Sequence, residues 1–152
     1  MKVGVISDTH GLLRPEMCMA FRGVDHILHA GDVGDPTILE ALAKLAPVTA
    51  IRGNIDKAGA CSLLPAEEYV TLAGVNLYML HDVAALSLDP VAAAVSAVIF
   101  GHSHKPLLEE RRGVLFFNPG AAGPRRFRLP ISAGFLYLDG GQVQAEHFAL
   151  SS

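Results

Sequence analysis

The sequence contains few of the residues that define several common classes of protein. It has only two cysteines, Cys18 and Cys61, and these have neither a zinc-ligand spacing nor the pattern of a disulfide framework. We interpret them as reduced thiols, which indicates a cytoplasmic protein. No apolar stretch approaches the roughly 20 residues that a membrane-spanning helix needs, since the longest, residues 91–100, is interrupted by Ser96. The first apolar run reaches Asp8 too early for a secretory leader.

Charge is also scarce, and there is no basic excess. Lys and Arg total 12, Asp and Glu total 15, and the formal net charge is -3. This balance argues against non-specific binding of nucleic acid through a basic surface. It remains compatible with a phosphate-bearing substrate if bound cations supply the positive charge. Hydrophobic residues make up 51% of the chain, which is ample for a core, and we expect one domain over residues 1–152.

Short apolar segments recur along the chain and predict strands at residues 3–6, 26–30, 48–51, 75–80, 97–100, 113–117 and 134–138. Several are nearly continuous runs, as is typical of strands buried on both faces. Helices are predicted at residues 14–22, 36–46 and 89–95. The second has Asp35 as its N-cap and Pro36 as its first residue. The last third contains mainly strands and ends in a hairpin around residues 139–142. We therefore expect an α/β domain built on two sheets.

Side chains that bind metals follow five of these strands. They are Asp8, His10, Asp32, Asn54, His81, His102 and His104. Active sites in open α/β sheets lie at the carboxyl ends of the strands, so we expect these seven side chains to converge. Two histidines separated by one residue can point into one site where the backbone turns, and Gly101 allows that turn.

Seven oxygen and nitrogen ligands are too many for one tetrahedral ion. They suit two divalent ions roughly 3.5–4 Å apart that share a bridging carboxylate. The mixture of carboxylate, imidazole and amide favours Mn, Fe, Ni, Co or Zn over Ca or Mg, and we expect Mn. Each feature alone has an ordinary explanation, because Asp8 can cap a helix and His81 can be a core or surface histidine. Gly-Asp and Gly-Asn are also common turn dipeptides. It is the ordered set at five strand ends that favours a metal centre.

The same residues resemble the motifs of the calcineurin-like metallophosphoesterases: Asp8-x-His10, Gly31-Asp32, Gly53-Asn54, His81 and Gly101-His102-x-His104. The resemblance spans residues 3–120, includes the sequence NPGA at 118–121, and is to the small bacterial and archaeal phosphodiesterase branch. It implies a two-sheet αββα sandwich and a binuclear phosphodiesterase in which a hydroxide bridging the metals attacks phosphorus. It assigns one ion to Asp8, His10, Asp32 and His104. It assigns the other ion to Asp32, Asn54, His81 and His102, with Asp32 as the bridge. Asp32, Asn54 and His81 are thereby expected to be catalytic.

Four positions depart from the family pattern or extend it. The family has a histidine after Gly-Asn that protonates the leaving group, but this chain has Ile55, which cannot donate a proton. We therefore expect a preference for phosphodiesters or aryl esters, whose leaving groups depart without an acid. Asp82 replaces a glycine and is expected to face solvent, the alternative being a contact with a ligand histidine. Arg125 and Arg126 are candidates for binding the substrate phosphate, although a solvated basic turn explains them equally well.

Two other functions compete with that of a hydrolase acting on a phosphate ester. A non-catalytic metal-binding scaffold, related to the retromer subunit that resembles the same branch, is expected to have lost ligands, and all seven are present. A metal-storage or sensing protein has no need of an open, phosphate-sized site. Among partners, we expect no membrane, and a second copy of the chain is a candidate through the edge of the final hairpin.

Overall fold

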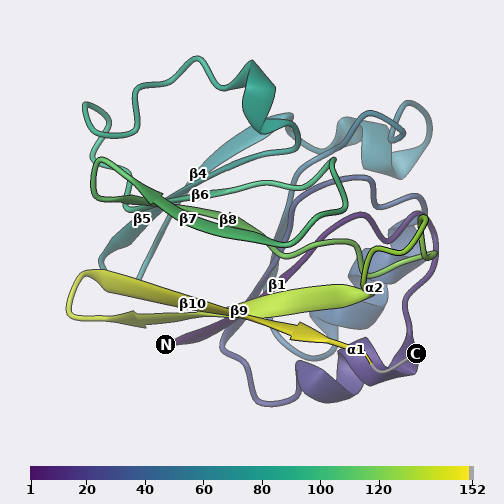
Figure 1. Cartoon of the computed structure of the whole chain (residues 1–152). Coiled ribbons are helices and arrows are strands. Elements are labelled where there is room, and N and C mark those ends of the chain that lie inside the picture. Colours follow the sequence, from purple (N-terminus) through teal and green to yellow (C-terminus); the bar gives the residue numbers. More distant parts are fainter. Residues whose placement is uncertain (151–152) are drawn as a thin grey trace.

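Two five-stranded β-sheets packed face to face form the centre of the molecule (Figure 1). The computed structural model describes residues 1–150, so the last two residues of the predicted domain lie outside the described part. In spatial order, sheet A contains β10 (Gln142–Ala149), β9 (Ser132–Asp139), β1 (Lys2–Ile6), β2 (His26–His29) and β3 (Val48–Ala50). Sheet B contains β4 (Glu67–Leu72), β5 (Val75–Leu80), β6 (Ala97–Ile99), β8 (Val114–Asn118) and β7 (Leu107–Arg111). The predicted two-sheet α/β fold is confirmed.

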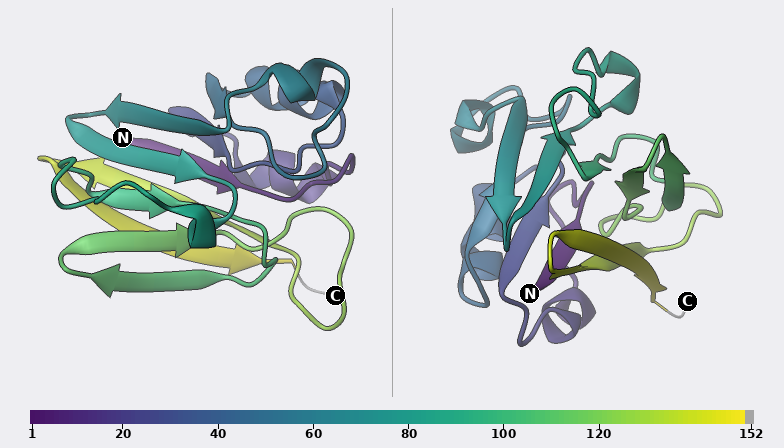
Figure 2. Two further views of the ribbon diagram at one scale, coloured as in Figure 1. Left: turned by 90° about the horizontal axis from the view of Figure 1, so that it is seen from above. Right: turned by 90° about the vertical axis from the view of Figure 1, so that its left-hand side faces the viewer.

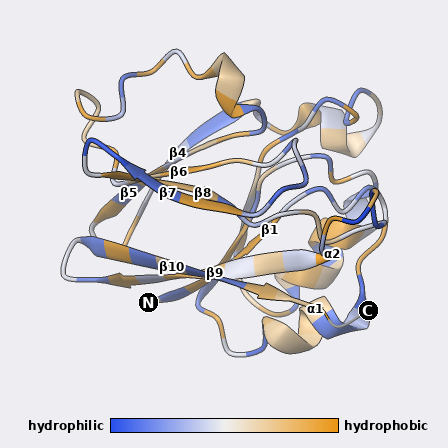
Figure 3. Cartoon of the chain, viewed as in Figure 1, coloured by the Kyte–Doolittle hydropathy of each residue, from blue (hydrophilic) through white to orange (hydrophobic). Residues whose placement is uncertain are grey.

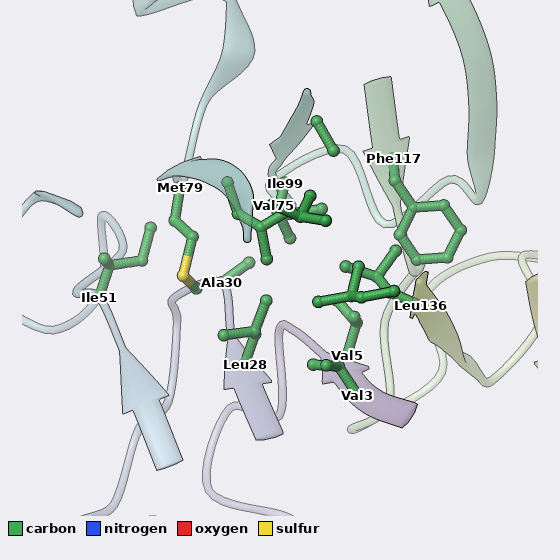
Figure 4. Close-up of a cluster of buried hydrophobic side chains, with 13 residues drawn as sticks. Val3, Val5, Leu28, Ala30, Ile51, Val75, Met79, Ile99, Phe117 and Leu136 are labelled. Carbon is green, nitrogen blue, oxygen red and sulfur yellow. The ribbon is translucent and has the colours of Figure 1, made fainter. Parts of the chain in front are cut away.

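An apolar core fills the space between the two sheets. Val5 and Leu28 of sheet A point toward Met79 and Ile99 of sheet B, and all four side chains are fully buried (Figure 4). Burying such a side chain stabilises the fold by about 1.5–3 kcal/mol. This core buries one face of β1, β5 and β6, which are almost continuously apolar in the sequence.

Helices cover the outer face of sheet A, as predicted. They are α1 (Pro15–Ala20) and α2 (Pro36–Ala43). Phe21, which follows α1, and Leu42 of α2 are fully buried and share an apolar cluster with Ile27 of β2. Helix α2 begins as its sequence indicates, because the Asp35 carboxylate accepts a hydrogen bond of 2.9 Å from the amide of Thr37. No helix within residues 1–150 is long and apolar enough to cross a membrane.

The outer face of sheet B is covered by irregular chain rather than by an α-helix. This layer consists of the 3₁₀ turn η2 (Val83–Ala85) and the segment that follows it, whose side chains pack on Val98 and Phe116. The helix predicted at residues 89–95 is wrong. The Asp89 carboxylate does cap the amide of Val91, but Ala94 adopts a left-handed conformation with φ of 57°, which ends the turn at once.

Three strands are not predicted from the sequence, because one or both of their faces are exposed. They are β4, β7 and β10. Strand β7 lies at the edge of sheet B, and its charged half is hydrophilic in Figure 3. Strand β4, which was not among the predicted strands, lies between the third and fourth ligand-bearing strands. The hairpin at residues 139–142 is confirmed, since Gln142 pairs with Asp139, and β10 forms a free edge of sheet A.

Parallel pairing brings the ligand-bearing strand ends to one side of the molecule. Strands β1, β2 and β3 are parallel in sheet A, and β5, β6 and β8 are parallel in sheet B. The views in Figure 2 show the loops that follow these strands gathered at the same end of the sandwich. The 3₁₀ turn η1 (Ala60–Leu63) follows the β3 loop.

Candidate metal centre

The ends of β1 and β2 place two buried aspartates beside a histidine. The amide of Asp8 donates a hydrogen bond of 3.0 Å to the carbonyl of Gly31, the residue before Asp32. Both carboxylates are almost completely buried. Nε2 of His10 lies 3.7 Å from Oδ1 of Asp8 and 3.4 Å from Oδ2 of Asp32. Two buried carboxylates are costly unless cations compensate them, so this arrangement favours bound positive charge.

Sheet B adds two histidines to the same cluster. Nε2 of His81 lies 3.2 Å from Oδ2 of Asp32 and 3.6 Å from Oδ1 of Asp8, and Nε2 of His104 lies 3.4 Å from Oδ1 of Asp8. Two groups of ligand atoms are close enough together for an ion: those of Asp8, His10 and His104, and those of Asp8, Asp32 and His81. Each carboxylate therefore reaches histidines of both predicted ligand sets.

The remaining two predicted ligands lie at the exposed rim. Oδ1 of Asn54 is 3.1 Å from Nδ1 of His102, and the ring of His102 stands edge-on to that of His81 with 5.3 Å between centroids. Asp82 is half-exposed, as expected, but its Oδ2 also lies 3.8 Å from Nε2 of His102, and its Oδ1 accepts from the amide of Ala84. All seven predicted ligands therefore lie at one end of the molecule.

Each aspartate has one oxygen fixed by the protein and one that faces the histidines. Oδ2 of Asp8 accepts hydrogen bonds from the hydroxyl of Ser7 at 2.7 Å and from the amide of His102 at 3.2 Å. Oδ1 of Asp32 accepts from the amide of Ile55 at 3.0 Å. The opposite oxygens are those that approach the histidines. This division orients both carboxylates for ligation.

Five of the seven predicted ligands have left-handed backbone conformations. Their φ values are 54° for Asp8, 46° for His10, 55° for Asp32, 73° for His102 and 63° for His104. Such conformations cost energy in residues other than glycine and concentrate at functional sites. The turn predicted for Gly101 is thus made by the histidines themselves. Gly101 is needed for space, because a Cβ atom there would lie 2.6 Å from Oδ2 of Asp8.

Unpaired buried atoms test whether a metal fits the cluster. Oδ1 of Asp8, Nε2 of His10, Nε2 of His81 and Nδ1 of His104 are buried and have no hydrogen-bond partner among residues 1–150. Native proteins rarely leave buried polar atoms unpaired, and ligation of a cation satisfies such atoms. Three of these atoms face one another, because Nε2 of His10 and Nε2 of His81 lie 3.7 Å and 3.6 Å from Oδ1 of Asp8. The donor set therefore fits divalent metal ions.

The electrostatics keep the carboxylates in the form that binds metal. Burial opposes ionisation of Asp8, but His10, His104 and His81 outweigh it and hold the pKa of Asp8 far below its ordinary value. The pKa of Asp32 is also lowered, since His81 and the Ile55 amide outweigh burial. Burial would lower the pKa of His81, but Asp32 and Asp8 raise it above the ordinary value. The two carboxylates are thus ionised at neutral pH.

Asp56 joins the two loops that carry Asp32 and Asn54. Its buried carboxylate accepts hydrogen bonds from the amides of Val33 (3.1 Å), Gly34 (3.0 Å) and Gly53 (2.9 Å). Asp56 therefore braces both loops rather than only completing a local turn. Its partners in the Asp32 loop lie more than 20 residues away in the chain, so no local pattern reveals them.

Two further buried polar residues support the ligand loops. The amide of Gly31 donates to Nδ1 of His29 at 3.2 Å, and Nε2 of His29 lies 3.0 Å from the hydroxyl of Thr9, which itself donates to the carbonyl of Val33. Asn118, in the NPGA sequence, donates from Nδ2 to the carbonyl of Gly101 at 3.0 Å. His29 thus connects the loops after β1 and β2, and Asn118 fixes the start of the GHSH loop.

The two candidate phosphate-binding arginines border the cluster. Arg125 and Arg126 line a small cavity of 180 Å³ together with His10, His104 and Pro124. The Arg125 side chain also donates to the carbonyl of Leu129 at 3.2 Å. Both arginines therefore lie on the metal-ligand side of the molecule.

A sandwich of two sheets with carboxylates and imidazoles clustered at the strand ends is the architecture of a metal-dependent phosphoesterase. A sequence model of the calcineurin-like phosphoesterase superfamily domain matches residues 1–141. A probable metallophosphoesterase of Methanothermobacter thermautotrophicus is 36% identical over 157 aligned positions, which cover 96% of this chain and 91% of that protein. The chain belongs to the calcineurin-like phosphoesterase superfamily.

Solved structures show the same fold at lower sequence identity. An archaeal phosphodiesterase superposes with a TM-score of 0.81 at 23% identity, covering 97% of this chain and 100% of that one. Vps29 of Entamoeba histolytica, complexed with zinc, superposes with a TM-score of 0.74 at 23% identity, covering 98% and 99% of the two chains. The family and fold predicted from the sequence motifs are therefore confirmed.

Proposed function

We propose that this protein, as one domain over residues 1–152, is a phosphodiesterase that uses two divalent metal ions. The first ion is bound by Asp8, His10, Asp32 and His104, and the second by Asp32, Asn54, His81 and His102. The observation that carries the proposal is the convergence of unpaired ligand atoms from Asp8, His10 and His81 at one buried point. Manganese is the proposed metal, with Ni, Fe, Co and Zn as alternatives that suit the same ligands.

The protein's own residues divide the work of this site. When bound, the two ions supply Lewis acidity, which generates hydroxide from water near neutral pH and offsets charge on the phosphoryl oxygens. Asp32 has one oxygen within 3.4 Å of His10 and 3.2 Å of His81, so it is placed to fix the separation of the two positions. Asn54 is neutral and adds a ligand without further negative charge. Arg125 and Arg126 attract the anionic substrate to the opening beside His10.

The preference for diesters over monoesters rests on Ile55. This side chain is 42% exposed and follows Asn54, at the position where the family has its proton donor. Without that donor, substrates with good leaving groups react and those with basic leaving groups react slowly. The likeness to an archaeal phosphodiesterase supports the same preference.

Metal content and turnover together test the proposal. The purified protein is expected to bind two manganese ions per chain and to hydrolyse bis-p-nitrophenyl phosphate, and a chelator is expected to abolish both. Metal binding without turnover on any diester would instead support the alternative of a non-catalytic scaffold. The likeness of the fold to that of Vps29 is the reason to test this alternative. A protein that binds no metal would overturn both functions.

A further inference from the structure

A second, larger cavity opens directly beside the proposed metal centre. It has a volume of 840 Å³ and is lined by His102, Ser103, Lys105, Arg126, Phe127, Arg128 and Leu129. Sites for small organic ligands have volumes of about 300–1,000 Å³. The cavity meets the metal centre at His102, and Arg126 lines both this cavity and the smaller one beside His10 and His104. A substrate phosphate at the centre therefore has room for its organic group here.

Phe127 presents its ring to this cavity from an unusual position. The residue is 88% exposed, the highest value among the large hydrophobic residues described, and its backbone is left-handed with φ of 55°. Bulky residues seldom adopt that conformation, and it persists where the surrounding structure imposes it. Phe127 belongs to the segment between β8 and β9, which loops outward from the body of the molecule and is yellow-green in Figure 2. The free face of the ring suits stacking with another planar ring.

The charge around Phe127 is positive, although the whole protein is acidic. Lys105, Arg126 and Arg128 line the cavity, and no carboxylate within residues 1–150 lies within ion-pair distance of any of them. Residues 101–108 and 119–131 contain no Asp or Glu, whereas the complete chain has a net charge of -3. The cavity therefore selects ligands that carry negative charge in addition to the phosphate at the metals.

We propose that this cavity binds the organic half of the substrate, and that this half is a nucleotide. Its base stacks on Phe127, and a further phosphate contacts Lys105 and Arg128. A cationic lipid head group would be repelled by the three cations, and an aliphatic polyol phosphate would leave the aromatic ring unused. The inference rests on the proposed function for the reaction, but nucleotide binding itself requires only the cavity.

The natural sequence contains no tryptophan, so a single introduced tryptophan makes the binding measurable by fluorescence. Phe127→Trp keeps an aromatic ring and provides a fluorophore within the cavity. Titration with ADP, on the metal-loaded full chain and again after chelation, is expected to quench its emission saturably in both states. Inorganic phosphate and ribose 5-phosphate are expected not to quench it. Leu63→Trp is the matched control, because Leu63 is also exposed, at 85%, but lies in η1 away from the cavity. Quenching that is linear, or equal to that of the control, would overturn the subsite.

Kinetics separate the subsite from the proposed function. The p-nitrophenyl ester of thymidine 5′-phosphate and methyl p-nitrophenyl phosphate share a leaving group, but only the first has a base. Phe127→Leu is expected to lower kcat/KM at least about fivefold for the first ester and to leave the second unchanged. Phe127→Trp is expected to restore the difference. The same proportional change in kcat/KM for both esters, or no change for either, in Phe127→Leu would reject the subsite while leaving the hydrolase intact. Saturable ADP binding without hydrolysis of either ester would reject the hydrolase and keep the subsite.

Self-association is the competing explanation of the exposed ring. Sedimentation of the wild type and Phe127→Leu is expected to show the same oligomeric state. A change of state in Phe127→Leu, with nucleotide binding unaltered, would assign the ring to a contact between copies and overturn the subsite.

Discussion

The carbonyl oxygen of Ala30 lies 2.7 Å from Nδ1 of His81, a contact that joins the end of β2 in sheet A to the end of β5 in sheet B. The carbonyl can only accept, so Nδ1 carries the proton and donates it. Nε2 is then the atom available as a ligand, and it faces the carboxylates of Asp32 and Asp8. The same hydrogen bond thus ties the two sheets together and fixes the tautomer that a metal requires.

Replacement of His81 is expected to remove one of the two metal positions. In His81→Ala, bound manganese should fall from two ions per chain toward one, and kcat/KM on bis-p-nitrophenyl phosphate should fall by more than about 100-fold, beyond the usual loss from a supporting residue. Elemental analysis and steady-state kinetics measure the two effects. His26→Ala is the control, because His26 lies at the opposite end of β2 and contacts Thr49 at 2.8 Å. Equal metal content in the two variants would remove His81 from the ligand set.

Loss of Asp56 is expected to weaken both the fold and the metal centre. Asp56→Ala leaves three backbone amides without their acceptor, which should lower the free energy of unfolding by about 2–4 kcal/mol. Metal affinity should fall about 10–100-fold, because the Asp32 and Asn54 loops lose their connection. Denaturant unfolding of the metal-free protein and metal titration measure the two effects.

A control separates stability from metal binding in this variant. Asp35→Ala removes the exposed N-cap of α2 and should cost about 1 kcal/mol of stability. It should leave metal affinity unchanged. If Asp56→Ala weakened metal binding no more than Asp35→Ala, Asp56 would serve the fold alone.

Acid is expected to destabilise the metal-free protein through His29. Burial lowers the pKa of His29 to about 4, and the Gly31 amide that occupies Nδ1 acts in the same direction. The unfolded side chain titrates near pH 6.5, so between pH 6.5 and 4 the unfolded chain binds more protons and the free energy of unfolding falls as pH decreases. From pH 7.5 to 4.5 this loss amounts to about 2.5 kcal/mol.

Comparison with His29→Gln isolates that contribution from the other titrating groups of the site. Urea unfolding at pH 7.5 and 4.5 should show the wild type losing about 2.5 kcal/mol more than the variant. Equal losses would mean that the pKa of His29 is the same in the folded and the unfolded chain.

Introduction of a histidine at position 55 is expected to change the dependence on the leaving group. In a series of aryl and alkyl diesters, the wild-type rate should fall steeply as the leaving-group pKa rises, because no acid assists departure. Ile55→His should flatten this dependence and accelerate the alkyl esters most, by about 10²–10⁴-fold at the limit of general acid catalysis. Ile55→Asn is a polar control without a suitable proton. If the wild-type rate did not depend on the leaving-group pKa, another residue would have to protonate the leaving group as it departs.

The seven candidate ligands can be recognised in the sequence because each lies within four residues of the end of a mainly apolar run. Such runs locate the ends of β1, β2 and β6, and the polar residues after them need no further information to be recognised. The strands β4, β7 and β10 are missed for the opposite reason, since their exposed faces carry polar residues that dilute the pattern. Asp89 and Pro90 resemble a helix start, but the backbone reversal at Ala94 has no counterpart in helix propensity.

Residues that act through distant partners could not be assigned from sequence. Asp56 contacts the loop of Asp32, and Asn118 contacts the loop of His102, so their roles exist only once the sheets are assembled. The left-handed conformations of Asp8 and Asp32 likewise have no counterpart in the local sequence pattern. The position of Phe127 could not be inferred from the sequence, because a lone aromatic residue in a loop has no periodic pattern.

Anomalous diffraction from crystals loaded with manganese tests the central claim most directly. The account predicts two peaks at the end of the sandwich, one contacting His10 and His104, the other contacting His81 and His102, with an oxygen of Asp32 between them. A single peak, or manganese bound away from Asp8 and Asp32, would contradict it.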